Sequence, residues 1–160
     1  MSGVVVLGVG NVLMSDEGVG VHAVGELERR FDFPPGVRLV DGGTSTHELL
    51  GDLEDLDHLI VIDAVSAGRE PAALVRLEGD AVPAAFTTRL SPHQAGIADL
   101  LATLKLLGRE PRHVVLYGVE PKRLTLDLSL SSEVARALPG LCARVVAELE
   151  RLGASPVPRS

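Results

Sequence analysis

The stretch of residues 4–20, VVVLGVGNVLMSDEGVG, constrains the fold more than any other part of this 160-residue sequence. Its first four residues are apolar and predict a buried strand of a parallel sheet. A loop with two glycines follows. Ser15 is then expected to be the N-cap of a helix whose first turn contains Asp16 and Glu17. This order of strand, turn and helix places polar groups at the carboxyl end of the strand, where open α/β sheets bind ligands.

Strand and helix patterns alternate along the rest of the chain. Further strands are expected at residues 37–40, 59–62, 73–77 and 113–119, and helices at about 16–30, 46–53, 95–107 and 131–152. The third of these strands is more polar than the others and is expected to be an antiparallel edge strand. The pattern predicts an α/β fold, a three-layer α/β/α sandwich with a mainly parallel sheet of about five strands. Residues 1–152 are expected to form a single domain, and residues 153–160 a frayed tail.

Charge and composition exclude several partner classes. The net charge is -7, and there is no block rich in lysine and arginine. The sequence contains one tyrosine, three phenylalanines and no tryptophan, so few side chains could stack on bases. Nucleic acid is therefore not expected to bind. The sequence has neither a membrane-spanning apolar run nor a secretory signal, which predicts a cytoplasmic protein without a membrane partner. One cysteine excludes an internal disulfide and a cysteine-based metal cluster. A monomer is the simplest expectation.

Three acids and a histidine are predicted to meet along one edge of the sheet. They are Glu17 at a helix start, Asp41 and Asp63 at strand ends, and His93 at a junction between a loop and a helix. Two carboxylates and an imidazole form a reasonable three-ligand site for zinc, nickel, iron or manganese, with positions open for the ligands of another molecule. The sequence has no compact metal motif such as HExxH, so spacing alone indicates the site only modestly.

Two other kinds of site fit the residues less well. Gly8 and Gly10 suggest a dinucleotide-binding loop, but Leu13 occupies the position of the third glycine. A Ser-His-Asp hydrolase could use Ser15, Ser45 or Ser91 with His93 and Asp63. The G-x-S-x-G elbow of many such hydrolases does not occur in the sequence.

Four segments carry a family resemblance. They are GVGNVLMSDEGVG (8–20), DGGT (41–44), DA (63–64) and SPHQ (91–94), in that order. With them the chain resembles the hydrogenase maturation proteases, endopeptidases that process the large subunit of nickel-iron hydrogenases. The resemblance extends over nearly the whole chain and weakens after about Glu120. Residues 95–111, AGIADLLATLKLLGREP, are most similar to members that serve uptake-type hydrogenases.

The resemblance implies a metal-binding set and a substrate. The family's metal ligands match Glu17, Asp63 and His93, while Asp41 belongs to a retained segment and is expected to support the site. The implied substrate is a hydrogenase large-subunit precursor loaded with nickel, from which the protease removes a C-terminal extension. Because the nickel arrives with this substrate, the isolated site is expected to be empty or to hold another divalent, zinc-like metal.

The chemistry of cleavage stays open at this point. A metal could polarise the scissile carbonyl or lower the pKa of a water molecule. The favoured interpretation is that the metal only positions the precursor, while a carboxylate, Asp63 or Asp41, activates water as in an aspartyl protease. A non-catalytic chaperone that binds the metal or the precursor is the alternative function. A small-molecule hydrolase or phosphorylase of related architecture is a third.

Overall fold

A five-stranded sheet forms the centre of the computed structural model, which describes residues 3–87 and 92–160. The strands, in spatial order, are β3 (Val37–Gly43), β1 (Val4–Val9), β4 (His58–Ala64), β6 (His113–Val119) and β5 (Leu74–Glu78). The first four are parallel, whereas β5 pairs antiparallel with β6. The expected mainly parallel sheet with an antiparallel edge strand is confirmed.

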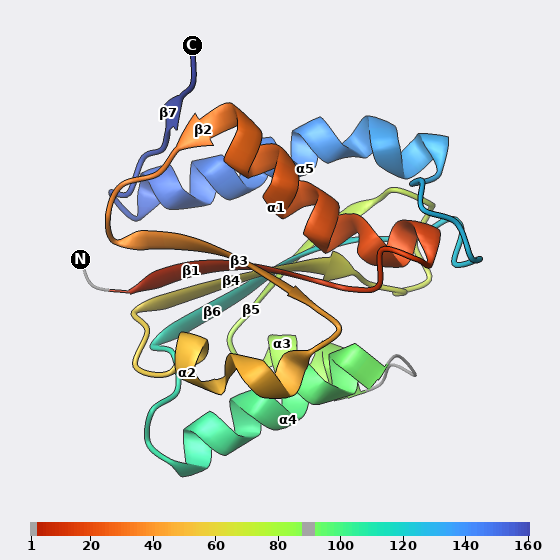
Figure 1. Cartoon of the computed structure of the whole chain (residues 1–160). Helices are drawn as coiled ribbons and strands as arrows, with labels where there is room; N and C mark the ends of the chain where they lie inside the picture. Colours follow the sequence, from red (N-terminus) through yellow and green to blue (C-terminus); the bar gives the residue numbers. More distant parts are fainter. Residues whose placement is uncertain (1–2, 88–91) are drawn as a thin grey trace.

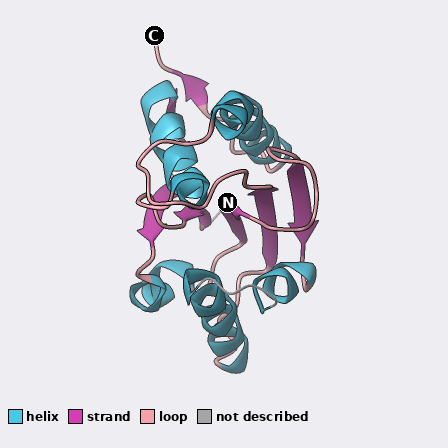
Figure 2. Ribbon diagram, turned by 90° about the vertical axis from the view of Figure 1, so that its right-hand side faces the viewer, coloured by secondary structure: helices cyan, strands magenta, loops and turns pink. Residues whose placement is uncertain are grey.

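Helices cover both faces of this sheet, as Figure 1 and the perpendicular view in Figure 2 show. One layer contains α1 (Val19–Arg30) and α5 (Ser132–Arg151). The other contains α2 (Leu50–Leu53), α3 (Ala81–Thr87) and α4 (Pro92–Leu106). The 3-10 helices η1 (Ser15–Gly18) and η2 (Thr46–Leu49) precede α1 and α2. The predicted three-layer α/β/α architecture is therefore confirmed. None of the helices in the described ranges is long and apolar enough to cross a membrane.

Strand β1 divides its side chains between two hydrophobic cores. Val4 and Val6 pack in the cluster with α1 and α5, whereas Val5, Leu7 and Val9 pack in the cluster with α4. All five side chains are fully buried because β1 lies between two parallel neighbours and two helical layers. Each buried valine or leucine side chain contributes about 1.5–3 kcal/mol. The continuous apolar run of the sequence reflects this two-sided burial.

Helix α1 lies unusually close to the sheet because two glycines face each other. A Cβ atom on Gly8 would overlap the carbonyl oxygen of Gly20, and one on Gly20 would overlap the carbonyl oxygen of Ile62. Only residues without a side chain permit this approach of helix and strand backbones. The contact places the start of α1, and the η1 turn before it, over the carboxyl ends of β1 and β4.

The structure corrects the expected start of the first helix. Ser15 was expected to cap it, but α1 begins at Val19 after the η1 turn, and the residue at its N-cap is Gly18. Ser15 is buried with φ +50° and donates its hydroxyl hydrogen to Ser129 O at 2.7 Å. A contact with a residue more than a hundred positions away therefore overrides the local capping preference.

Other predicted boundaries were wrong by a few residues. Strands β3 and β4 run further than expected, so that Asp41 and Asp63 lie within strands rather than after them. Helix α4 begins at Pro92, so His93 lies in its first turn, and a proline is well suited to that first helical position. Helix α3 lies where no strand or helix was predicted. Ser91 and the three residues before it lie outside the described ranges.

The C-terminal residues were expected to be frayed, but they are paired. The short strand β7 (Val157–Pro158) lies antiparallel to β2 (Phe31–Asp32), and Arg159 N donates to Arg30 O at 2.8 Å. Ala154 is buried against the α1–α5 core. These contacts attach the tail to the end of α1.

Two glycines of α1 provide a matched test of the close helix–sheet contact. Gly20→Ala is expected to lower the free energy of unfolding by about 1–3 kcal/mol or more, because the new methyl group would overlap strand backbone. Gly25→Ala meets no atom within 4 Å and is expected to raise it by about 0.5–1 kcal/mol. Urea denaturation of both variants measures the difference, and a similar effect of the two substitutions would contradict the packing described here.

Candidate active site

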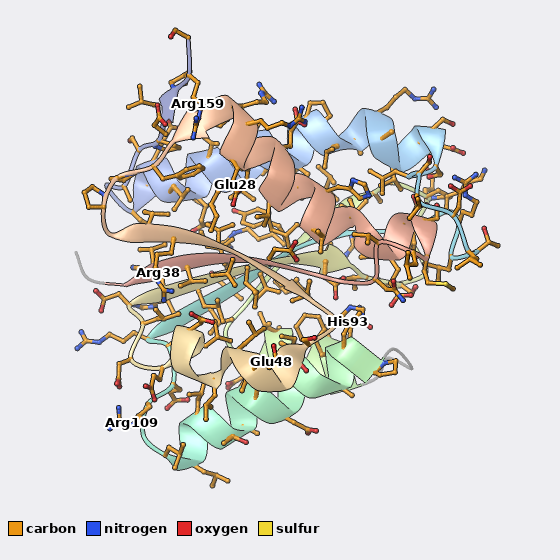
Figure 3. All side chains as sticks on the ribbon, viewed as in Figure 1. Glu28, Arg38, Glu48, His93, Arg109 and Arg159 are labelled. Carbon is orange, nitrogen blue, oxygen red and sulfur yellow. The ribbon has the colours of Figure 1, made fainter. Side chains whose placement is uncertain are left out.

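Three of the four predicted site residues come together at the carboxyl edge of the sheet. His93 Nε2 lies 2.9 Å from Asp63 Oδ2, and His93 Nδ1 lies 3.2 Å from Glu17 Oε1. The imidazole therefore lies between two carboxylates, one from β4 and one from η1. Figure 3 shows His93 at this edge, between the sheet and the start of α4. Asp63 and His93 are buried, whereas Glu17 is partly exposed and connects the site to solvent.

Gln94 holds the carboxylate of Asp63 in place and is a residue to which the sequence interpretation assigned no role. Its Nε2 donates to Asp63 Oδ2 at 3.0 Å and to the carbonyl oxygen of Ala64 at 2.8 Å. The other oxygen, Asp63 Oδ1, accepts from Ala64 N at 2.8 Å. Both carboxylate oxygens are thus bound within the protein. The SPHQ segment could have indicated this role, because Gln94 follows His93 at the start of a helix and can reach the same end of β4.

Burial and charge shift the pKa values of the buried pair. Burial raises the pKa of the Asp63 carboxyl above its ordinary value, although the hydrogen bond and positive charge of His93 partly oppose the shift. Burial lowers the pKa of His93, but hydrogen bonds and attraction from Asp63 and Glu17 outweigh it, so the net pKa is raised. The arrangement favours an imidazolium ion shared by two carboxylates.

Gly10 allows the loop that carries Glu17 to approach Asp63. It has φ +130°, and a Cβ atom at this position would overlap Glu17 O and lie 3.3 Å from Asp63 Oδ1. Gly10 N also donates to Gly43 O at 2.9 Å, which ties the loop to the end of β3. A side chain at residue 10 would therefore push η1 away from the end of β4.

Asp16 anchors this loop rather than facing the site. Its carboxylate is fully buried and accepts four hydrogen bonds from the segment after β6. The donors are Lys122 N, Arg123 N, Ser131 N and Ser131 Oγ, at 2.7–2.9 Å. The partners of Asp16 lie more than a hundred residues away, so the sequence alone does not indicate this role. In the structure it orients η1, so that the adjacent Glu17 points to His93.

Asp41, the fourth predicted residue, is not brought to the other three. It pairs with Gly8, which pairs with Ile62, so Asp41 lies two strands and about 10 Å from β4. Paired residues share a face, and Ile62 faces the α1 layer, whereas Asp63 faces α4. The exposed Asp41 carboxylate accepts from Gly43 N at 3.0 Å. A catalytic role for Asp41 stays a prediction.

The donor set suits a divalent metal, but its arrangement is that of a hydrogen-bonded chain. One imidazole nitrogen and two carboxylates match the ligands of zinc and similar ions. Within the described ranges, however, no three His, Cys, Asp or Glu side chains are already grouped to hold a metal ion. His93 can ligate a metal only by releasing one of its carboxylate partners.

A serine nucleophile finds no support at this site. The hydroxyl of Ser15 donates to Ser129 O and accepts from Arg123 Nε, and Ser45 is exposed. Both ring nitrogens of His93 already face carboxylates. Ser91, the third serine considered, lies outside the described residues.

Two histidines are expected to titrate in opposite directions. The pKa of His93 is raised by its two carboxylate partners, whereas burial and the nearby His113 ring lower the pKa of His58. A nuclear magnetic resonance titration of the ring protons should therefore find His93 charged at a pH where His58 is neutral. Because the folded pKa of His93 exceeds the unfolded one, its stabilising effect is complete below about pH 6.5 and is lost as pH rises through the folded pKa. The reverse order of the two midpoints would contradict the hydrogen-bonded chain.

Known proteins that are similar to this chain in sequence and fold include hydrogenase maturation proteases. The family model for hydrogenase maturation protease matches residues 21–148. The hydrogenase 2 maturation protease of Escherichia coli (strain K12) is 41% identical over 157 residues, which cover 98% of this chain and 96% of that protein. The hydrogenase expression/formation protein HupM of Azotobacter chroococcum mcd 1 is 40% identical, covering 98% and 76% respectively.

A solved structure agrees over the same length. The hydrogenase maturating endopeptidase HybD from E. coli has a TM-score of 0.96 to this structure and 40% sequence identity, and the match covers 98% of each chain. The match in sequence and in fold therefore covers almost the whole chain. The chain belongs to the hydrogenase maturation protease family and is a peptidase.

Proposed function

We propose that this peptidase removes the C-terminal extension of a nickel-loaded hydrogenase large-subunit precursor. The observation that carries the proposal is the imidazole of His93 held between Glu17 and Asp63 at the sheet edge. These are the residues that the family resemblance assigns to metal recognition. We further propose that the protein acts as a monomer in the cytoplasm, with the precursor as its partner.

Recognition of nickel would be coupled to a change at His93. The nickel belongs to the precursor and reaches the site as part of the substrate. His93 can give a ring nitrogen to it only by leaving Glu17 or Asp63, since each nitrogen faces one of them. A precursor without nickel offers nothing to replace that hydrogen bond. In the isolated protein, zinc or another divalent ion is proposed to use the same three side chains.

Asp63 is the proposed general base. When His93 turns away, Asp63 Oδ2 loses one of its two donors and gains room for a water molecule. The raised pKa of the buried Asp63 carboxyl brings it closer to neutral pH, where a base is most effective. Gln94 and Ala64 N keep the carboxylate oriented meanwhile. Asp41 is the weaker candidate, because it lies on the opposite face of the sheet from Asp63.

Cleavage of the cognate precursor, with and without nickel, tests the proposal. The wild type should release a C-terminal peptide only from the nickel-loaded precursor. Asp63→Asn should lower kcat by about 10²–10⁴-fold, the usual effect of losing a general base, while precursor binding survives. Glu17→Gln and His93→Ala should weaken binding of the loaded precursor and leave binding of the unloaded one unchanged.

Asp99→Asn is a matched control, because Asp99 is an exposed acid on α4, six residues after His93. It should cleave at the wild-type rate. Cleavage that is indifferent to nickel and to all three site substitutions would overturn the assignment. Binding of the precursor without cleavage by the wild type would instead indicate a maturation chaperone.

A further inference from the structure

A ridge of exposed apolar side chains lies beside the candidate active site. It is formed by Val12 and Leu13 of the glycine loop and by Leu124, Leu126 and Leu128 of the segment after β6. We refer to these five residues as the leucine ridge. Leu126 is 80% exposed and Leu128 67%. Scattered exposed leucines are ordinary on a protein surface, but exposed apolar side chains that gather on two paired segments favour an interaction site.

The polarity of these two segments is the reverse of the usual one. Their inward side is polar, since Ser15, Asp16 and Ser131 are at most 4% exposed, while their outward side carries the leucines. The buried polar groups are satisfied by the hydrogen bonds of Asp16 and Ser15 described above. Simple hydrophobic burial would place the leucines inside and the serines outside. The hydrogen bonds of the buried Ser15, Asp16 and Ser131 therefore fix the backbone so that the leucine side chains face solvent.

The ridge is preformed. Asp127 N donates to Leu13 O at 2.9 Å, and Ser15 N donates to Asp127 O at 2.8 Å, so the two segments pair as a short β-bridge. Asp16 holds the segment after β6 at Lys122 N and Arg123 N. A surface with its backbone already fixed loses little conformational entropy when a partner binds.

The ridge is continuous with the site. The backbone of Val12 packs on the η1 turn, where a Cβ atom on Gly18 would lie 2.7 Å from Val12 Cα, and Glu17 is the neighbouring residue. In Figure 1 the segment between β6 and α5 lies at the same end of the molecule as η1 and the start of α4. The ridge and Glu17 therefore lie at the same end of the molecule, where one bound polypeptide can contact both.

We infer that the leucine ridge binds apolar side chains of the precursor next to the bond that is cleaved. This inference rests on the proposed function, because it takes the substrate to be the large-subunit precursor. The occupant is expected to be an apolar stretch of the precursor, because the exposed side chains of the ridge are those of valine and leucine. The ridge would thus select the precursor by its apolar side chains, whereas Glu17 and His93 would recognise its nickel.

Two double variants separate the ridge from exposed leucines in general. Leu126→Ser with Leu128→Ser removes the centre of the ridge. Leu106→Ser with Leu107→Ser removes two leucines that are 89% and 57% exposed at the far end of α4, about 20 Å from His93. All four residues are exposed, so both variants should fold, which circular dichroism and urea denaturation can verify.

The ridge variant should raise KM for the nickel-loaded precursor by about tenfold or more and leave kcat unchanged, because burial of a single leucine already accounts for about a tenfold change in affinity. The Leu106 and Leu107 variant should match the wild type in both constants. Unchanged KM in the ridge variant, with normal cleavage by the wild type, would overturn the inference and leave the proposed function intact.

Binding and mass measurements distinguish the remaining outcomes. Biolayer interferometry with immobilised precursor should show weaker binding of the ridge variant, a result that supports the ridge even if the wild type does not cleave. Light scattering should give the same mass for both variants. A wild-type dimer that the ridge substitutions convert to a monomer would show that the ridge joins two copies of this chain, and would overturn the inference.

Discussion

The close contact of α1 with β1 and β4 is the constraint on which the site depends. Gly8 and Gly20 permit it, and the helix start is thereby fixed over the carboxyl ends of the central strands. Gly10 then lets the η1 turn approach Asp63, and Asp16 holds that turn from the other side. Together these contacts hold Glu17 Oε1 at 3.2 Å from His93 Nδ1. The glycines of this loop thus allow the turn that carries the Glu17 carboxylate to approach the sheet closely. This role differs from phosphate binding.

Much of this could be predicted from the sequence. The apolar run of β1 and its glycines indicated the sheet edge, and the alternation of strands and helices predicted the three layers, which the structure confirms. The resemblance of four short segments predicted the protease family, which the comparisons show. Glu17, Asp63 and His93 were expected to meet because they follow or start elements at one edge, and they do come together.

The remainder depends on contacts that local patterns do not contain. Ser15 and Asp16 fit the pattern of a helix cap, but their partners lie in the segment after β6, so no window of sequence contains both. The strand face of Asp41 depends on the sheet register with β1, which sequence alone did not provide. The position of the His93 ring between two carboxylates could not be predicted from the sequence either, because a shared edge of the sheet does not determine the order of side chains along it. The same edge could have held a metal cage or, as here, a hydrogen-bonded chain.

His93, with Glu17 and Asp63, is proposed to bind the nickel of the precursor. X-ray absorption at the nickel edge of the loaded precursor, recorded alone and with this protein added, tests it most directly. Addition of wild type should add nitrogen and oxygen ligands to the nickel, and addition of His93→Ala should leave the nitrogen ligand out. An identical nickel spectrum with wild type and with His93→Ala, at concentrations where both bind the precursor, would contradict the account.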